Sequence, residues 1–292
     1  MTLTALALVL ASTITHAWWN FLLKRAGGSQ TFVGLSKASE AILLSPFFVW
    51  MALVNPAPVH GVWTLVMVGA VLVLLNYAAL AKAYSKGHLS IVYPVSRGGV
   101  LFVLPVFGYI VFGERLGAAS ASGMLLIVCG ILLLTLGDFR WSAMQTFWAN
   151  LATPATGFAL AAAGFAGVYT IWDKRAVNTM PVFQYFFFYT CIVAAVYMVA
   201  LRVRHTSVQI AAEWRANHRS IISVGALNSI TYLMVLAALR SSASSSVIAV
   251  RQLSIAWSVV LGVAVLREPL RAPTLVGSVL ILVGCGLTAL QR

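Results

Sequence analysis

Residues 93–130 read YPVSRGGVLFVLPVFGYIVFGERLGAASASGMLLIVCG, and residues 247–284 read VIAVRQLSIAWSVVLGVAVLREPLRAPTLVGSVLILVG. The two stretches are copies of one pattern, because a constant offset of 154 positions superimposes arginine, glutamate and glycine positions in both. Each copy is an apolar run with an arginine near its start and a glutamate just past its end, then a second apolar run. Such a repeat is typical of membrane carriers built from two related halves. The equivalent pairs are Arg97 and Arg251, Gly108 and Gly262, Glu114 and Glu268, Gly123 and Gly277, and Gly130 and Gly284.

The composition places the whole chain in a bilayer. The 292 residues are 61% hydrophobic and only 9% charged, which leaves too little polar surface for a soluble domain of this size. The mean hydropathy is +0.95. A net charge of +13 would normally raise nucleic acid as a partner, but the basic residues lie singly or in pairs between apolar runs. That distribution is typical of loop charges that orient helices in a membrane, so we expect a lipid bilayer and no nucleic acid as partner.

A helix needs about 20 apolar residues to cross a hydrocarbon core that is ~30 Å thick. By that criterion the sequence predicts an all-α polytopic membrane protein with ten transmembrane helices. The basic stretch 202–219 is predicted to be a loop or a surface helix at the lipid headgroups. The ten predicted spans are residues 3–23, 31–54, 62–81, 91–112, 117–136, 154–172, 181–201, 220–239, 244–266 and 272–290.

The spans divide into two five-helix repeats, residues 1–137 and 154–292, joined by a connector at 138–153. An odd number of spans per repeat makes the two copies cross the membrane in opposite directions, as inverted repeats around a central cavity. Two halves of this kind can exchange conformations, which predicts alternating access. We call the membrane face of the two termini side A and the other face side B. Roughly twice as many Lys and Arg residues lie in the side B connections, which favours a cytoplasmic side B.

Three charged residues are predicted to lie at similar depth from side B. Glu40 is about nine residues, or ~13 Å, into its span, and Lys37 is one turn away. Because unpaired charges are costly in a membrane, we expect Lys37, Glu40 and Arg97 to form a cluster that holds two spans together or closes side B. The alternative is that Arg97 offers its guanidinium to a substrate carboxylate. Arg251 has no comparable acid nearby in sequence, so we expect it to be the more available arginine.

Glu114 and Glu268 each follow the end of one span and precede the start of the next by two or three residues. The favoured interpretation is that each caps the helix that follows it, at 117–136 and at 272–290, where a carboxylate meets free backbone N–H groups. A salt bridge that acts as a gate is the alternative. In those same two spans the glycines seven residues apart share one face, which predicts close helix packing.

Other polar or aromatic side chains within the spans are candidates for the wall of the cavity, since such groups favour an interior with partners over lipid. The sequence contains no nucleotide-binding loop, no metal-binding motif and no nucleophile with a base, so we expect no enzyme, cofactor or metal. We expect His16 to be hydrogen-bonded to a neighbouring helix rather than to carry protons. With the two arginines, the predicted cavity residues are His16, Trp19, Asn20, Asn76, Tyr77, Tyr169, Asn228, Tyr232 and Gln252.

Several short motifs resemble a known family. Gly113-Glu114-Arg115-Leu116 and Arg267-Glu268-Pro269-Leu270 follow equivalent spans, and His16-Ala17-Trp18-Trp19-Asn20 lies in the first span. Together with the repeat, they resemble the ten-helix EamA-type carriers of the drug/metabolite transporter superfamily, and in layout the YddG-like exporters of aromatic and other amino acids. The resemblance implies spans 1–4 and 6–9 around a central cavity, with spans 5 and 10 peripheral. It also implies cytoplasmic termini, contrary to the charge distribution, and a bacterial inner-membrane location.

The first functional hypothesis is therefore a secondary transporter that exports amino acids or similar small metabolites, acting as a monomer. Small four-helix relatives in the superfamily couple to protons through a glutamate in their first helix, and the first span here has none, which favours facilitated export or exchange. The second hypothesis is efflux of amphipathic cationic compounds, which requires an acid exposed in the cavity. A membrane enzyme acting on lipid-linked substrates is the remote alternative.

Overall fold

The computed structural model describes residues 1–54, 61–137, 141–149, 151–267 and 269–290, and these residues form helices and no strands. Ten apolar segments are long enough to cross a membrane, which confirms the predicted all-α polytopic fold. Helices suit such sequences because they satisfy every backbone polar group internally. The helices are α1 (Leu3–Arg25), α2 (Gln30–Val54), α3 (Trp63–Lys86), α4 (Leu89–Phe112), α5 (Ala118–Leu136), α6 (Trp141–Ala149), α7 (Pro154–Thr179), α8 (Val182–Arg204), α9 (Ser207–Leu239), α10 (Ser244–Arg251), α11 (Leu253–Leu266) and α12 (Ala272–Ala289).

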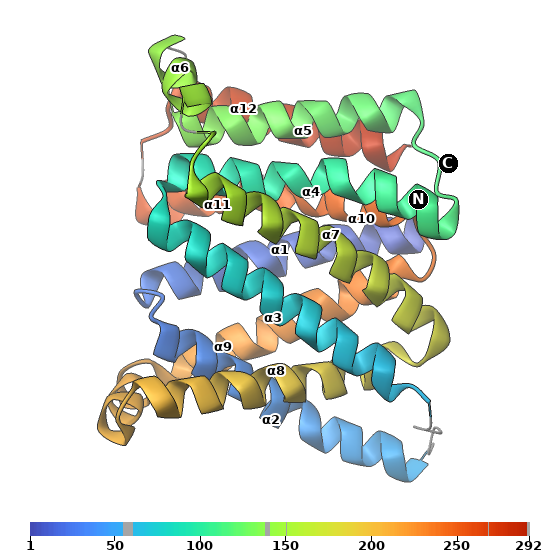
Figure 1. Ribbon diagram of the computed structural model, residues 1–292, viewed down its shortest axis with the longest axis vertical. Helices are drawn as coiled ribbons and strands as arrows, with labels where there is room; N and C mark the ends of the chain where they lie inside the picture. The colour runs from blue at the N-terminus through green and yellow to red at the C-terminus, as the bar shows by residue number, and fades with distance from the viewer. Residues whose placement is uncertain (55–60, 138–140, 150, 268, 291–292) are drawn as a thin grey trace.

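The chain threads back and forth so that both termini lie at the same end of the molecule, which is side A (Figure 1). Helix α1 runs from side A to side B, whereas its repeat partner α7 runs from side B to side A. The short helix α6, which follows the first repeat in sequence, lies at side B. Across the centre, α3 and α4 pack on α7, and α1 and α2 pack on α9. Helices from opposite repeats therefore face each other across the middle of the molecule.

Helices α5 and α12 lie side by side at one edge of the molecule (Figure 1) and pack against each other more extensively than any other pair. Four glycines make this possible. A Cβ atom on Gly123 would lie 2.5 Å from the carbonyl oxygen of Gly284, and one on Gly130 would lie 2.6 Å from that of Gly277. The backbones therefore approach to a distance that only glycine permits, which confirms the predicted role of these residues.

The predicted start of a span at residue 220 is wrong, whereas the helical alternative for the stretch 202–219 is confirmed from Ser207 onwards. The stretch 202–219 contains the end of α8 and the start of α9, a single helix of 33 residues that continues without a break into the span. Thr206 and Gln209 start α9 with a capping box, since each side chain accepts a hydrogen bond from the backbone N–H of the other. The capping box therefore starts the helix at Ser207, although the residues that follow are largely polar. The connector at 138–153 also contains a helix, α6.

The predicted span 244–266 is one crossing made of two helices, α10 and α11, which meet at Gln252. The N–H of Gln252 bonds to the carbonyl of Ala249, three residues back, at 3.0 Å. Its side-chain amide donates to the carbonyl of Ile248, four residues back, at 3.3 Å. The thiol of Cys285, from α12, donates to the Ala249 carbonyl at 3.4 Å. Side chains thus satisfy carbonyls at the break, as an interrupted helix in a membrane requires.

The ends of α4 and α11 show that the repeat extends to backbone conformation. Gly113 ends α4 with φ 66°, and the equivalent position in the second half, Arg267, ends α11 with φ 56°. Both are left-handed caps, a conformation that glycine adopts freely and other residues adopt at a cost of about 1–2 kcal/mol. Arg267 is the only non-glycine residue with positive φ in the part of the chain that the structure describes.

Candidate functional site

A cavity of about 390 Å³ lies between the two repeats, near the middle of the membrane-spanning helices. All eleven residues predicted to line a substrate cavity do line it, and so do Lys37 and Glu40. The sequence thus located the wall of the cavity, while the role of each residue in binding stays a prediction. Other lining residues include Leu23, Val33, Ser36, Leu80, Tyr93, Ser96, Val100, Thr170, Phe186, Tyr189, Tyr197, Ile248, Ser254 and Ser258.

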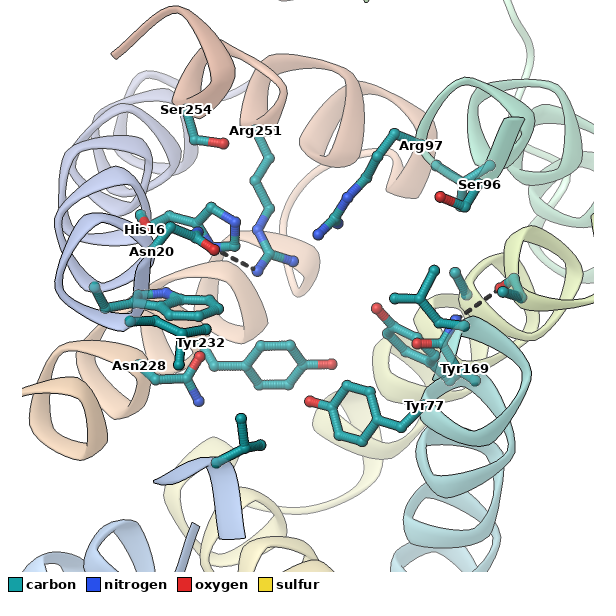
Figure 2. Close-up of a pocket in the computed structure, with 18 of the residues that line it drawn as sticks. His16, Asn20, Tyr77, Ser96, Arg97, Tyr169, Asn228, Tyr232, Arg251 and Ser254 are labelled. Atoms are coloured by element: carbon teal, nitrogen blue, oxygen red, sulfur yellow. Dashed lines mark hydrogen bonds between the residues drawn. The ribbon is translucent and has the colours of Figure 1, made fainter. Parts of the chain in front are cut away.

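Arg251 is the last residue of α10, directly before the break in the span. Its Nη2 lies 3.3 Å from Nδ1 of His16, and its guanidinium lies 5.8 Å from the ring centroid of Tyr232. Since a guanidinium can only donate, Nδ1 of His16 accepts this bond. The imidazole therefore holds the guanidinium in place, and Figure 2 shows Arg251 reaching into the cavity beside it. His16 bonds to a neighbouring helix, as the sequence predicted.

Arg97 does not pair with Glu40, so the predicted cluster of three charges is wrong. Lys37 donates to Glu40 Oε1 at 2.9 Å, and the amide of Asn228 on α9 donates to the same oxygen at 2.7 Å. Glu40 is 2% exposed, and Lys37 neutralises its charge while Asn228 connects it to α9. Arg97 is exposed and points into the cavity (Figure 2), and among the described residues it forms no ion pair. Arg97 rather than Arg251 is the less anchored of the two arginines.

The amide groups that line the cavity already donate hydrogen bonds to backbone carbonyls, either of their own span or of a neighbouring helix. Asn76 donates to the carbonyl of Ala162 on α7 at 2.7 Å, and Asn20 donates to the carbonyl of His16 at 2.8 Å. The side-chain amide of Gln252 donates to the carbonyl of Ile248, at the break in its own span. The hydroxyl groups of Tyr77, Tyr169 and Tyr232 instead point towards the centre of the cavity (Figure 2).

Asp173 is a buried acid that the sequence analysis missed. It is 1% exposed, and it accepts hydrogen bonds from the hydroxyls of Tyr185 at 2.6 Å and Tyr232 at 2.5 Å. The sequence placed the end of this span at Trp172, where an acid would face water, but α7 continues to Thr179. The spacing of Tyr169 and Asp173, four residues apart on one helical face, was the available signal. Both tyrosine partners come from other helices.

Three consecutive residues of α7 connect the helices at the side A end of the cavity, and we call them the α7 clasp: Trp172, Asp173 and Lys174. Trp172 donates through its indole N–H to the carbonyl of Leu65 on α3 at 2.8 Å. Asp173 accepts from α8 and α9, as described above. Lys174 donates to Glu114 Oε1 at 2.5 Å and to the carbonyl of Ser242 at 2.8 Å. Through the clasp, α7 is bonded to neighbours from both repeats.

Glu114 caps a helix, but not the helix that the sequence indicated. Its carboxylate oxygens accept from the N–H of Ser244 at 3.1 and 3.0 Å and from its hydroxyl at 3.1 Å, at the first residue of α10. Helix α5 begins at Gly117 without a side-chain cap. The predicted cap of the helix at 117–136 is therefore wrong. Glu114 also forms a salt bridge with Lys174, and its action as a gate stays a prediction. Glu268 lies outside the described residues.

In the first repeat, the residues that line the cavity lie nearer to the side B ends of their helices than to the side A ends. In α1 to α4 the lining residues extend to within two turns of the side B ends, at Leu23, Val33, Leu80 and Tyr93. The lining residues of these helices nearest to side A are His16, Glu40, Asn76 and Val100, each about three turns or more from the side A end. In the second repeat, Phe186 and Ile248 line the cavity about one turn after the side A starts of α8 and α10, close in sequence to the clasp partner Tyr185 and to Ser244, which bonds Glu114.

Comparisons with known proteins agree with this arrangement. Residues 153–290 match the EamA-like transporter family, which confirms the resemblance to EamA-type carriers in the second half of the chain, while the likeness to YddG-like exporters stays a prediction. A solved chain titled "Crystal structure of protein" is 15% identical and superimposes with a TM-score of 0.75, over 98% of this chain and 97% of that chain. At this identity the likeness shows a shared fold. No curated protein matches the sequence significantly.

Proposed function

We propose that this chain, a multi-pass membrane protein that carries an EamA-like transporter domain, exports amino acids or similar small carboxylate-bearing metabolites by alternating access through the central cavity. We place it in the bacterial inner membrane. The observation that carries the proposal is a polar cavity at mid-membrane depth with two arginines directed into it. Guanidinium groups match the geometry of carboxylates, and intramembrane charges mark the path of a substrate or an ion.

The lining of the cavity supports a small organic substrate with polar and apolar parts. A volume of about 390 Å³ falls within the range of small-molecule sites, which bury most of the ligand. Tyr77 and Tyr169 supply hydroxyl groups that donate and accept hydrogen bonds, and the rings of Tyr77, Tyr169 and Tyr232 supply apolar surface. The hydroxyl of Tyr232 donates to Asp173 and can only accept a bond from a substrate. Phe186 and Val100 add apolar surface to the wall of the cavity.

Alternating access is supported by the difference between the two ends of the cavity. In α1 to α4 the lining residues come closest to side B, whereas the α7 clasp bonds the helices together at side A. In the other conformation of the cycle, these bonds break and the equivalent helices of the first repeat close side B. The inverted repeat supplies two related halves for such an exchange.

Efflux of cationic compounds is the second candidate, and the contacts of Glu40 weigh against it. A cationic substrate needs an available carboxylate in the cavity, but Glu40 is already bonded to Lys37 and Asn228. Asp173 is similarly bonded to two tyrosines. The EamA-like domain favours transport over the enzymatic alternative.

Efflux from proteoliposomes tests the proposal. Vesicles containing the purified protein are loaded with radiolabelled phenylalanine, threonine or glutamate, and the loss of label is followed against protein-free vesicles. We expect protein-dependent efflux of at least one of these amino acids. If none of them leaves faster than from protein-free vesicles, the proposal is wrong.

A further inference from the structure

We propose that Arg97 and Arg251 act as a pair that binds two negative charges on one substrate, so that the cavity selects small organic dianions such as dicarboxylates or phosphate monoesters. The inference rests on the proposed function, because it concerns the substrate of the same carrier. It narrows that function from carboxylate-bearing metabolites in general to those with two acidic groups or a doubly charged phosphate.

The two arginines enter the cavity at matching depths from opposite faces of the membrane. Arg97 lies eight residues after Leu89, the first residue of α4 at side B, or ~12 Å along the helix. Arg251 lies seven residues after Ser244, the first residue of α10 at side A, or ~10 Å. Because the hydrocarbon core is ~30 Å thick, both guanidinium groups reach the central part of the membrane. Figure 2 shows both pointing into the same space.

The charges of the cavity do not balance without a ligand. Lys37 and Glu40 neutralise each other, which leaves the guanidinium groups of Arg97 and Arg251. Elsewhere in the described part of the chain, Glu114 is paired with Lys174, whereas Asp173 and Glu213 are hydrogen-bonded to neutral side chains. Asp173 does not bond either arginine and is linked to Arg251 only through Tyr232, whose ring lies 5.8 Å from the guanidinium. Two positive charges at this depth are costly unless an anion accompanies them. The substrate is the group that can supply two negative charges.

The neutral groups beside the arginines also favour an anion. The indole N–H of Trp19 is buried and has no hydrogen-bond partner among the described residues, and Trp19 lines the cavity. An indole N–H can only donate, so its natural partner is an acceptor oxygen. The Nδ1 atom of His16 is occupied by Arg251, so the imidazole orients that guanidinium and does not compete for the ligand. The guanidinium groups are the donors that point into the cavity, and they are suited to carboxylate or phosphate oxygens.

A simple zwitterion would fit this arrangement less well. Its single carboxylate would neutralise one arginine and leave the other unpaired, and its ammonium group would need an acid. Glu40 is the acid that lines the cavity among the described residues, and it is already held by Lys37 and Asn228. Among amino acids, those with an acidic side chain can place a carboxylate on each arginine, but their ammonium group still has no free acid in the cavity, so dicarboxylates without an amine fit better.

Ligand-induced thermal stabilisation of the purified protein tests the proposal at pH 8, where each acidic group is ionised. The probes are pairs of similar size that differ in charge: succinate with succinamate, glutamate with glutamine, and glycerol 3-phosphate with glycerol. We expect the more anionic member of at least one pair to stabilise the protein more strongly. Titrations then give the dissociation constants, and the responding pair distinguishes dicarboxylates from phosphate monoesters.

Variants assign the effect to the two arginines. R97Q and R251Q should each weaken binding of the dianion roughly 10- to 100-fold, the usual loss when a charged hydrogen-bonding partner is removed. R97K and R251K keep the charge and should weaken binding less. K82Q removes an exposed charge from α3 outside the cavity and should bind as the wild type does. If R251Q fails to fold, the comparison of probes on the wild-type protein and on R97Q still decides the question.

Three results would overturn the inference. The first is equal stabilisation by both members of every pair, the second is unchanged dianion affinity in R97Q and R251Q, and the third is no stabilisation by any of the dianions. Each of these can occur while amino acids still leave the proteoliposomes, in which case the proposed function stands and the dianion preference fails. Absence of efflux in the same preparation would remove the proposed function itself.

Discussion

Replacing Lys174 by glutamine should open side A of the cavity. Lys174 connects α7 to Glu114 at 2.5 Å and to the carbonyl of Ser242 at 2.8 Å, and both charged side chains are nearly buried, with exposed fractions of 12% and 9%. These bonds join helices at the side A end of the cavity, so they stabilise the conformation in which side A is closed. Removing the charge should therefore shift the equilibrium between the two conformations towards an open side A.

The size of the shift follows from the contacts that remain. Breaking a buried ion pair by removing one partner typically costs 3–5 kcal/mol. We expect the lower value of about 2 kcal/mol here, because Glu114 keeps its hydrogen bonds from the N–H and hydroxyl of Ser244. If the Lys174–Glu114 ion pair is absent when side A is open, the substitution destabilises only the closed conformation, by the full amount. The open fraction should then rise roughly 30-fold, since 1.4 kcal/mol corresponds to a factor of ten.

Cysteine labelling with a charged maleimide in detergent measures this fraction. The reporter is S245C, at a position 5% exposed in the first turn of α10, in a background without the three native cysteines. Its labelling rate should increase in K174Q by up to about 30-fold. A second reporter, T288C, lies fully buried in α12, which packs against α5 away from the clasp, and its rate should stay unchanged.

R240Q is the matched control, because it removes one exposed positive charge just after the side A end of α9. It should leave both labelling rates unchanged. An unchanged rate at S245C in folded K174Q would refute the assignment of the clasp as the closure of side A. A parallel increase at T288C would show general loosening of the protein instead, and would refute it equally.

Three further predictions concern packing and backbone conformation. G69A should lower the thermal unfolding midpoint, because its Cβ would collide with the hydroxyl of fully buried Tyr185. It should also increase S245C labelling, since Tyr185 donates to Asp173 of the clasp. G164A, with open space at its Cβ, should change neither quantity. G123A should lower the stability of the protein by about 1–3 kcal/mol, seen as a lower unfolding midpoint, because its Cβ would meet the backbone of α12. R267G should raise that midpoint by a few degrees, because it relieves about 1 kcal/mol of left-handed backbone strain. An unchanged midpoint in G69A or G123A, or a lower one in R267G, would contradict the corresponding contact or strain.

The membrane architecture could be predicted because its signals are local. Apolar runs mark the spans, and the repeat of Arg97 and Glu114 at Arg251 and Glu268 marks the two halves. The residues that line the cavity could also be predicted, since polar side chains within a span avoid lipid and turn inwards. Each of these inferences requires only the position of a residue along its own helix.

The pairing of charged groups could not be predicted, because it depends on which helices become neighbours. Glu40 lies at the right depth to meet Arg97, but α2 packs against α9 rather than α4, so Asn228 becomes its second partner. Glu114 lies closest in sequence to the start of α5, yet the start of α10 lies nearer to it in space. A helix start in either position has the same free N–H groups, and only the fold decides which of them the carboxylate meets.

The break in the ninth span and the role of Asp173 have a similar origin. Neither proline nor glycine marks the break, and the side chain of Gln252 that bonds the Ile248 carbonyl is an ordinary helix residue in the sequence. Asp173 follows an apolar run, where a carboxylate normally faces water, and its tyrosine partners lie on two other helices. Polar groups that are satisfied by distant partners give no local signal.

Counterflow in proteoliposomes tests most directly whether one cavity is exposed alternately to the two sides. Vesicles containing the protein are preloaded with unlabelled glutamate and diluted into buffer with a trace of labelled glutamate. Alternating access predicts a transient accumulation of label above its equilibrium level, which disappears in R97Q and in vesicles without preloaded substrate. Label that rises only to its equilibrium level, regardless of preloading, would contradict the account.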